Sequence, residues 1–135
     1  MENMTKYKKL GLKLTPQRLA IIEYLDGNEI HPSAEDIYRE VSKRFPTMSF
    51  ATVYNTLEAL RQRGSIAELT IDQGKKRFDP NTELHHHIIC TKCKRIEDVH
   101  RHYNLYVSTG NMNGFEITGN HIEFYGLCPD CRPRS

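Results

Sequence analysis

The sequence lacks a long hydrophobic run. Across its 135 residues, no apolar stretch approaches the roughly 20 residues that a membrane-spanning helix needs. The first residues, MENMTKYKKLG, also lack the apolar core of a secretory signal peptide. We therefore expect a cytoplasmic protein of one domain or two small ones, with no membrane partner. Cysteine is scarce, with four residues, and because cytoplasmic thiols stay reduced we expect metal ligands before disulfides.

Acidic residues are almost absent from two segments of the chain. The net charge is only +2, but residues 1–18 hold five basic side chains against one acid, and residues 61–77 hold five against two. Residues 23–40, which lie between them, carry six acids and one base. Two basic segments on either side of an acidic one are compatible with a polyanion-binding surface. They are equally compatible with ordinary solvated faces.

Residues 1–80 carry the signals of helices. Thr15-Pro16 predicts an N-cap followed by proline at the first helical position. Ser33 begins a capping box for a second helix, which Pro46 should end. Ser49 caps a third helix, which Gly64 should close. Helices are thus expected from residue 16 to about 25, from 34 to about 44 and from 50 to 63, with a weaker one over residues 2–11.

A β-hairpin is expected directly after the third helix. The segments SIAELTI and KKRFD flank the turn signal Asp72-Gln73-Gly74. Three helices and a basic hairpin predict a winged helix-turn-helix, in which the last helix enters the major groove of DNA and the wing follows the backbone. On that helix Val53, Leu57 and Leu60 are spaced as a buried face, which leaves polar side chains outside. The expected DNA contacts are Thr52, Tyr54, Asn55 and Arg61, with Lys13, Lys75 and Lys76 from the basic segments.

Two CxxC pairs account for every cysteine: Cys90 with Cys93, and Cys128 with Cys131. Four thiolates can surround a tetrahedral Zn²⁺ ion, and such a closed site is structural. The 34 residues between the pairs exceed the length of a compact zinc ribbon, and the pattern GFEITGNHIEFYG predicts a hairpin among them. Unmetallated thiols or redox-active CxxC pairs are the alternatives.

The stretch HHHIIC predicts a second metal site. In a strand, side chains alternate between faces, so His85 and His87 point the same way and His86 points opposite. The His85–His87 pair can clamp a metal, but not the zinc, whose four positions the thiolates fill. Candidate partners from elsewhere in the chain are Asp98, Asp79 and His31. A polar strand with hydrogen-bonded histidines is the alternative.

Six stretches carry a resemblance to a known family: LTPQRLAIIEYL, HPSAEDIY, SFATVYNTLEAL, RFD, HHHIICTKCKRIED and YGLCPDC. With them the chain resembles the ferric uptake regulator (Fur) family of bacterial metal-dependent repressors, and most of all its peroxide-responsive branch. The resemblance implies an α+β fold, with a winged helix-turn-helix DNA-binding domain in residues 1–80. Residues 81–135 would form a small α/β dimerisation domain with the four-cysteine zinc site. The resemblance also implies that the protein is not an enzyme. It would be a homodimer that represses transcription by binding palindromic double-stranded DNA operators.

The resemblance further implies a regulatory Fe²⁺ or Mn²⁺ site. Carried over by position, its ligands are His31, Asp79, His85, His87 and Asp98. Three nitrogen and two oxygen donors suit these ions better than a thiolate site would. In the peroxide-responsive branch the oxidised ligands correspond to His31 and His85, and their oxidation releases metal and then DNA. Iron-sensing relatives usually have Glu at the position of Asp98, so an iron-availability repressor is the alternative function.

Other histidines are not expected to bind metal. His86 stands where many iron sensors have an acid, and Asn120 stands where they often have a histidine, so their additional metal site is not expected here. We expect surface or structural roles for His100, His102 and His121.

Two other classes of function are less compatible with the sequence. A metal-dependent hydrolase would need a general acid or base beyond the ligands, and none is evident. An adaptor protein that has the structural zinc but no sensing role would give His31 and Asp79 no function as metal ligands.

Overall fold

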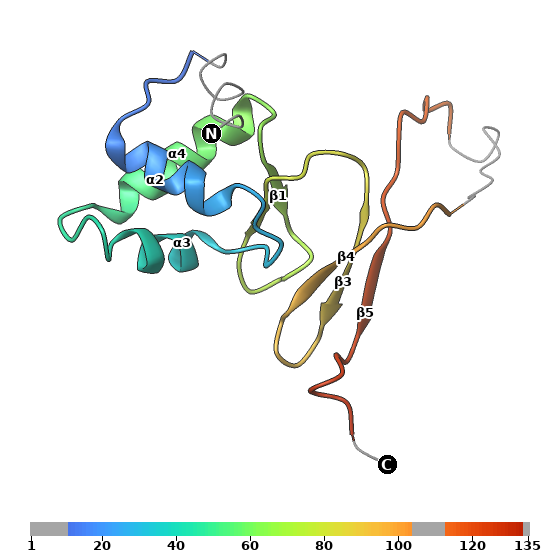
Figure 1. The fold of residues 1–135 in the computed structure, drawn as a ribbon. Coiled ribbons are helices and arrows are strands. Elements are labelled where there is room, and N and C mark those ends of the chain that lie inside the picture. The colour runs from blue at the N-terminus through green and yellow to red at the C-terminus, as the bar shows by residue number, and fades with distance from the viewer. Residues whose placement is uncertain (1–10, 104–112, 134–135) are drawn as a thin grey trace. The chain divides into compact units, whose positions relative to one another are not determined.

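The computed structural model describes residues 11–103 and 113–133 (Figure 1). The helix expected over residues 2–11 lies outside them, apart from Gly11, which is in a turn. The chain divides into two compact units, Met1–Glu83 and Leu84–Ser135. The division falls a few residues after residue 80, where the sequence indicated the domain boundary. Within the described residues, no helix is long and apolar enough to cross a membrane.

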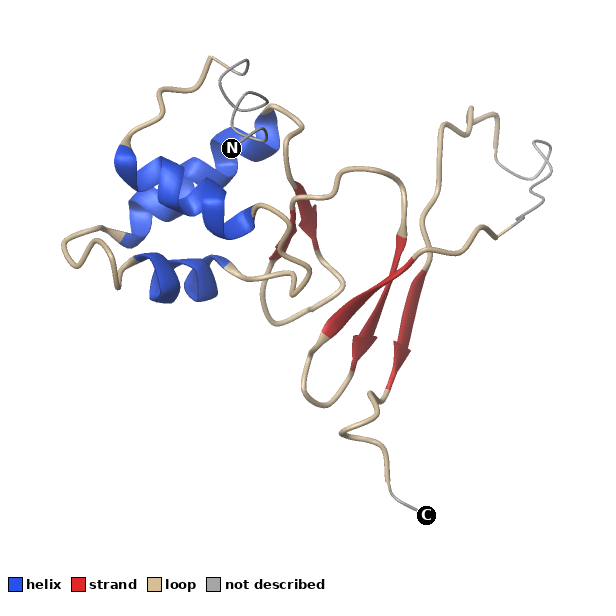
Figure 2. Ribbon diagram, in the orientation of Figure 1, coloured by secondary structure: helices blue, strands red, loops and turns tan. Residues whose placement is uncertain are grey.

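The described part of the first unit contains three helices, as the capping signals indicated (Figure 2). They are α2 (Pro16–Leu25), α3 (Ala34–Val41) and α4 (Phe50–Gln62). The Thr15 hydroxyl caps α2, Ser33 and Asp36 form the full capping box of α3, and Ser49 caps α4. Each of these side chains accepts a backbone N–H that the first turn of a helix leaves without an internal partner.

The ends of α3 and α4 differ in how well the sequence predicted them. Helix α3 ends at Val41, so the expectation that it continues until Pro46 stops it was wrong. The Arg44 and Phe45 N–H groups both donate to the Val41 carbonyl, so the last turn tightens before Pro46 is reached. Helix α4 ends as expected: Gly64 has a φ of +72°, and the Gly64 and Ser65 N–H groups donate to the last turn of α4 in a Schellman motif.

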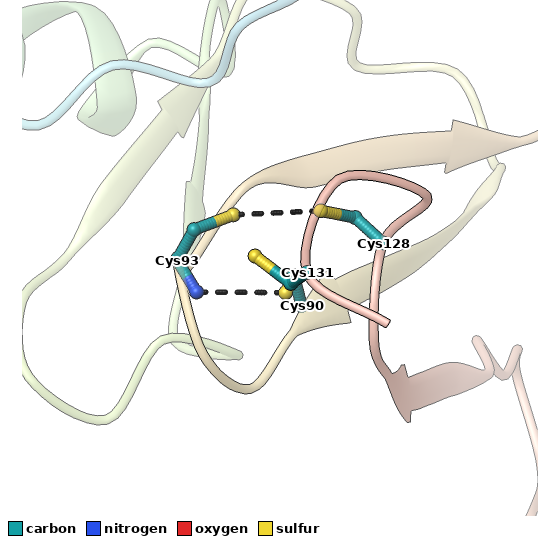
Figure 3. Close-up of side chains that lie close together, drawn as sticks. All are labelled: Cys90, Cys93, Cys128 and Cys131. Carbon is teal, nitrogen blue, oxygen red and sulfur yellow. Dashed lines mark hydrogen bonds between the residues drawn. The ribbon is translucent and has the colours of Figure 1, made fainter. Parts of the chain in front are cut away.

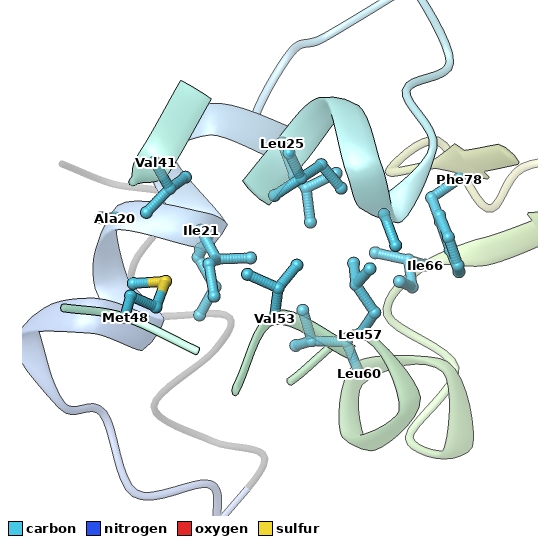
Figure 4. Packing of buried hydrophobic residues seen from close by; sticks show 13 residues of the cluster. Ala20, Ile21, Leu25, Val41, Met48, Val53, Leu57, Leu60, Ile66 and Phe78 are labelled. Carbon is cyan, nitrogen blue, oxygen red and sulfur yellow. The ribbon is translucent and has the colours of Figure 1, made fainter. Parts of the chain in front are cut away.

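A hydrophobic core joins the three helices to the strands that follow (Figure 4). The expected inner face of α4 is confirmed, because Val53, Leu57 and Leu60 are each at most 1% exposed. Side chains of α2 and α3 pack against it, together with Phe78 from the wing. The core residues labelled in Figure 4 are Ala20, Ile21, Leu25, Val41, Met48, Val53, Leu57, Leu60, Ile66 and Phe78.

The wing is the expected antiparallel hairpin, with shorter strands than the sequence suggested. Strands β1 (Ala67–Leu69) and β2 (Arg77–Asp79) pair with Glu68 opposite Phe78. In the connecting segment, an Asp72 carboxylate oxygen accepts the Gly74 N–H at 2.8 Å, which is the Asx-type turn expected of Asp-x-Gly. Together with α2, α3 and α4, the hairpin completes a winged helix-turn-helix.

The second unit contains a three-stranded mixed sheet. Its strands are β3 (His86–Cys90), β4 (Ile96–Val99) and β5 (Glu123–Gly126), in the order β4-β3-β5. Strand β3 pairs antiparallel with β4 and parallel with β5. The hairpin predicted over residues 114–126 was therefore wrong. Its second half is a strand, but this strand pairs with β3, and residues 113–122 form no strand. Alternating sequence predicts an extended segment but cannot identify its partner.

Helix α4 gives the first test of the fold. Leu57→Ala should lower the free energy of unfolding of the first unit by about 2–5 kcal/mol, because it empties a fully packed position. Asn55→Ala, on the exposed side of the same helix, is the matched control. It should lower the free energy of unfolding by less than about 0.5 kcal/mol. Urea denaturation followed by circular dichroism measures both, and equal losses would contradict the assignment of the inner face.

Candidate metal centres and nucleic-acid interface

The four cysteines gather at one end of the sheet in the second unit (Figure 3). Cys90 ends β3 and Cys93 lies in the turn that follows, while Cys128 and Cys131 lie just after β5. The parallel pairing sets Cys90 beside Gly126, and this brings the two CxxC pairs together. All four Sγ atoms lie within 4.8 Å of one another.

The spacing of the sulfur atoms fits a zinc ion. Zn–S bonds of about 2.3 Å place the sulfurs of a regular tetrahedron about 3.8 Å apart. The Cys93 and Cys128 sulfurs are 3.8 Å apart. The turns are shaped as metal-binding knuckles: Lys94 N–H donates to the Cys90 carbonyl and Arg132 N–H to the Cys128 carbonyl, both at 2.9 Å.

The thiols differ in acidity. Backbone N–H groups of Cys128 and Cys93 lower the pKa of Cys90 to about 5. Hydrogen bonding to the Cys128 sulfur, with burial, raises the pKa of Cys131 to about 12. The backbone N–H groups thus favour the thiolate form of Cys90, whereas the environment of Cys131 favours its protonated form.

In the first unit, His31 and Asp79 form one pair of possible ligands. Nε2 of His31 lies 3.5 Å from a carboxylate oxygen of Asp79, and both side chains are at most 3% exposed. Asp79 ends β2, and His31 precedes the cap of α3. The Phe78 N–H donates to the Pro32 carbonyl at 2.9 Å, so the end of the wing runs alongside the loop that holds His31.

In the second unit, His85, His87 and Asp98 form another group of possible ligands. His87 lies opposite Asp98 in the antiparallel register of β3 and β4. Nε2 of His85 and Nε2 of His87 lie 3.1 Å and 3.4 Å from the same oxygen of Asp98. The two imidazole rings have their centroids 4.5 Å apart. Two ring nitrogens and one carboxylate oxygen thus converge on one point.

His86 points away from that group, as the strand alternation predicted. Its Nδ1 accepts the Ile122 N–H at 2.9 Å, and its ring lies edge-on to Tyr103. His86 therefore supports the pairing of β3 with the chain entering β5, which is a structural role.

Sequence reasoning missed the position of His100. Its side chain is 64% exposed, as expected of a surface residue, but its ring stacks on that of His85 at 5.5 Å between centroids. Its Nε2 lies 3.8 Å from the second oxygen of Asp98. The signal was available: if His87 faces Asp98, then the residues two positions further out, 85 and 100, face each other as well. His102 is exposed, and His121 is exposed beside Glu123, as expected.

All of the candidate DNA-contacting residues except the half-buried Thr52 are exposed on the first unit. On α4, Tyr54 is 45% exposed and Asn55 is also exposed, while the Thr52 hydroxyl is hydrogen-bonded to Ser49. Lys13 and Lys75 are exposed. Arg61 and Lys76 form ion pairs with Glu58 and Glu68 respectively, so their positive charges are partly balanced within the unit.

Comparison with known proteins places these features in a family. The model of the ferric uptake regulator family matches residues 9–125. The peroxide operon regulator of Bacillus subtilis is 40% identical over 132 residues, which are 96% of this chain and 91% of that protein. The peroxide-responsive repressor PerR of Staphylococcus epidermidis is 39% identical over 97% of this chain and 89% of its own length.

A solved structure agrees with the sequence relatives. The solved structure of the peroxide stress regulator of Campylobacter jejuni matches with a TM-score of 0.66 at 30% sequence identity. The match covers 97% of this chain and 100% of the Campylobacter jejuni chain. Since the similarity in sequence and in fold extends over nearly the whole length, the chain belongs to the ferric uptake regulator family.

Proposed function

We propose that this protein is a metal-dependent transcriptional repressor that responds to hydrogen peroxide. The observation that carries the proposal is the convergence of His85 and His87 on one oxygen of Asp98, in a chain whose cysteines all lie in a separate cluster. Both curated relatives described above are named as peroxide-responsive regulators. The protein would act in the cytoplasm as a homodimer on a palindromic DNA operator, because a two-fold dimer reads two inverted half-sites.

The four cysteines hold a structural Zn²⁺ ion in this proposal. Four thiolates complete a tetrahedral shell and leave no position for water or substrate. A zinc ion there would fix the turn after β3 to the chain after β5. Structural zinc in small peptides contributes on the order of 10–16 kcal/mol of apparent binding free energy, which is also folding free energy.

The histidines and aspartates serve a regulatory Fe²⁺ or Mn²⁺ ion. We assign His31 and Asp79 from the first unit, and His85, His87 and Asp98 from the second, as its ligands. Nitrogen and carboxylate donors suit these ions, whereas Zn²⁺ is better served by the thiolates. If one ion takes donors from both units, it binds best to one arrangement of them, and it shifts the population of dimers toward the arrangement that binds DNA.

Peroxide then acts on the ligands themselves. A bound Fe²⁺ ion would activate hydrogen peroxide beside its ligands, and the imidazole ring would supply both of the electrons that the peroxide accepts. The His31 or His85 ring takes up one oxygen atom at a ring carbon, while the other oxygen of the peroxide leaves as water. An oxidised imidazole is a poorer ligand, so the ring no longer holds the metal and the DNA-binding arrangement is lost. No thiol competes, because the cysteines belong to the other cluster.

Base reading by α4 is tested by Asn55→Ala. An amide that pairs with adenine is worth about 1–3 kcal/mol of discrimination, so this variant should lose preference for operator over random duplex while keeping both metals. Lys75→Gln is the control: it should weaken binding to both duplexes equally and reduce the salt dependence. Fluorescence anisotropy at several salt concentrations measures these effects. Unchanged discrimination in Asn55→Ala would remove Asn55 from the base-reading set.

The zinc site predicts a proton count that depends on pH. At pH 7, zinc uptake by metal-free protein should release the proton of Cys131, whose pKa is about 12. It should release none from Cys90, whose pKa of about 5 leaves it already ionised. Zinc affinity should therefore fall with falling pH, and more steeply below about pH 5, where Cys90 also holds a proton.

Calorimetry in two buffers of different ionisation enthalpy measures the released protons. Cys128→Ser provides the comparison, since it should not retain zinc or form the dimer. A dimeric Cys128→Ser protein that stays folded without zinc would refute a structural role for the ion.

The peroxide response is tested by mass spectrometry of iron-loaded protein after brief exposure to hydrogen peroxide. The peptide containing His31 or His85 should become one oxygen atom heavier, and operator binding should be lost. Manganese-loaded protein should show neither change, because Mn²⁺ does not readily promote the oxidation of a ligand by hydrogen peroxide. Asp98→Glu should keep metal-dependent DNA binding but respond less to peroxide. If neither histidine is modified while zinc stays bound, the protein is an iron-availability repressor instead.

A further inference from the structure

Arg77 is a buried arginine that the proposed function does not use. It begins β2, two residues before the proposed ligand Asp79, yet its side chain is only 10% exposed. Three of its nitrogen atoms donate hydrogen bonds. Nη1 donates to Asp72 at 3.1 Å, Nη2 donates to the Ile30 carbonyl at 3.3 Å, and Nε donates to the His31 carbonyl.

These bonds join two functional segments of the first unit. One is the loop that carries His31. The other is the turn of the wing, because the second oxygen of Asp72 accepts the Gly74 N–H and Lys75 follows directly. The Asp72 side chain is 3% exposed, so the ion pair is shielded from solvent and from salt. A single guanidinium group thus lies between a proposed metal ligand and a proposed DNA contact.

The loop end of this connection is tightly constrained. His31 has a φ of +56°, a left-handed conformation that a residue with a side chain adopts only when its surroundings hold it there. The Pro32 carbonyl is bound by the Phe78 N–H, and the His31 carbonyl is bound by Arg77. Because the guanidinium is planar and rigid, it cannot follow a movement of His31 without changing its contact with Asp72.

We infer that Arg77 is a positioning residue through which the regulatory metal at His31 sets the geometry of the wing. The inference rests on the proposed function and adds a route within the first unit. Metal binding fixes the His31 loop, the loop fixes the Arg77 guanidinium, and Arg77 fixes Asp72 and the turn that presents Lys75. The ion pair is then part of the coupling between metal and DNA, and the coupling acts equally in both directions.

The measured quantity is the coupling factor, which is the ratio of operator Kd without Mn²⁺ to operator Kd with saturating Mn²⁺. The protein is the full-length zinc-loaded dimer, and the operator is a duplex that the wild-type protein selects from random sequences in the presence of Mn²⁺. Asp72→Asn is the main variant, since its amide oxygen can still accept the Gly74 N–H while its NH₂ group no longer pairs with Arg77. Mn²⁺ is used because it avoids peroxide chemistry.

Asp72→Asn should lower the coupling factor by about tenfold while Mn²⁺ affinity without DNA changes by less than about threefold. Hydrogen exchange at the Gly74 amide should slow on Mn²⁺ addition in the wild type and not in the variant. Arg77→Lys keeps the positive charge but cannot make the three hydrogen bonds of the planar guanidinium, so it should lower the coupling factor in the same way. The double variant should show no further loss, because the two residues act as one unit.

Lys13→Gln is the matched control, because Lys13 is an exposed candidate DNA contact outside the wing: it should weaken DNA binding with and without Mn²⁺ and leave the coupling factor unchanged. An unchanged coupling factor in Asp72→Asn would overturn the inference. Loss of coupling through a collapse of Mn²⁺ affinity, or through unfolding, would also overturn it, since Arg77 would then be only structural. A wild-type protein whose DNA binding ignores Mn²⁺ would instead refute the proposed function itself.

Discussion

The backbone pairing of β3 with both of its neighbours determines the chemistry of the second unit. Its antiparallel register with β4 sets His87 opposite Asp98, and its parallel register with β5 sets Cys90 beside Gly126, just before the second CxxC pair. One strand of five residues therefore serves both candidate metal centres. A slip of one residue in either register would turn a ligand to the opposite face of the sheet. The Ile122 N–H bond to His86 and the Thr91 N–H bond to the Gly126 carbonyl oppose a slip between β3 and β5 at the two ends of β3.

The first unit contains a buried ion pair between Arg77 and Asp72. Burial alone would raise the pKa of Asp72, but hydrogen bonds from the Gly74 N–H and from Arg77 more than offset it and hold that pKa below its ordinary value. Asp72 therefore binds protons less readily in the folded chain than in the unfolded chain. Its contribution to stability is present above the unfolded pKa of about 4 and is lost as the pH falls through the lower native value.

An apolar core of similar volume would often be at least as stable as a buried ion pair. Arg77 and Asp72 nevertheless form a buried pair within the wing, close in sequence to the proposed ligand Asp79, and the contacting residue His31 holds a left-handed backbone. Local departures from the most stable choice of residue are typical of functional sites.

The sequence predicted the features that rest on short-range chemistry. Caps at Thr15, Ser33 and Ser49, the inner face of α4 and the Asp72-Gln73-Gly74 turn each depend on residues a few positions apart, and all are present. The cysteine pairs and the His85–His87 pair were found because cysteine and histidine at fixed spacing carry a chemical meaning that does not depend on the fold. His31, Asp79 and Asp98 were assigned as ligands through the family resemblance.

Features that depend on distant partners were missed. The pairing of β5 with β3 joins segments more than thirty positions apart (His87 and Glu123), and alternating polarity does not encode which strand is the partner. Arg77 was counted as part of a basic surface segment, whereas its charge is buried against Asp72 and two carbonyl groups of the His31 loop. Helix α3 also ended before Pro46, where the Arg44 and Phe45 N–H groups both donate to the Val41 carbonyl.

The separation of donor types gives the proposed sensor its selectivity. Thiolates bind Zn²⁺ firmly and are easily oxidised. A redox-active ion beside them would therefore first oxidise the four cysteines that hold the structural zinc. Here Cys90 and His87 lie on the same strand three positions apart, and alternation in a strand places residues at odd separations on opposite faces. The sulfur cluster and the His87–Asp98 group therefore belong to different faces of one sheet. An oxidant generated at the nitrogen and oxygen donors meets imidazole rings before it meets sulfur, so the same short strand that builds both centres also keeps their chemistries apart.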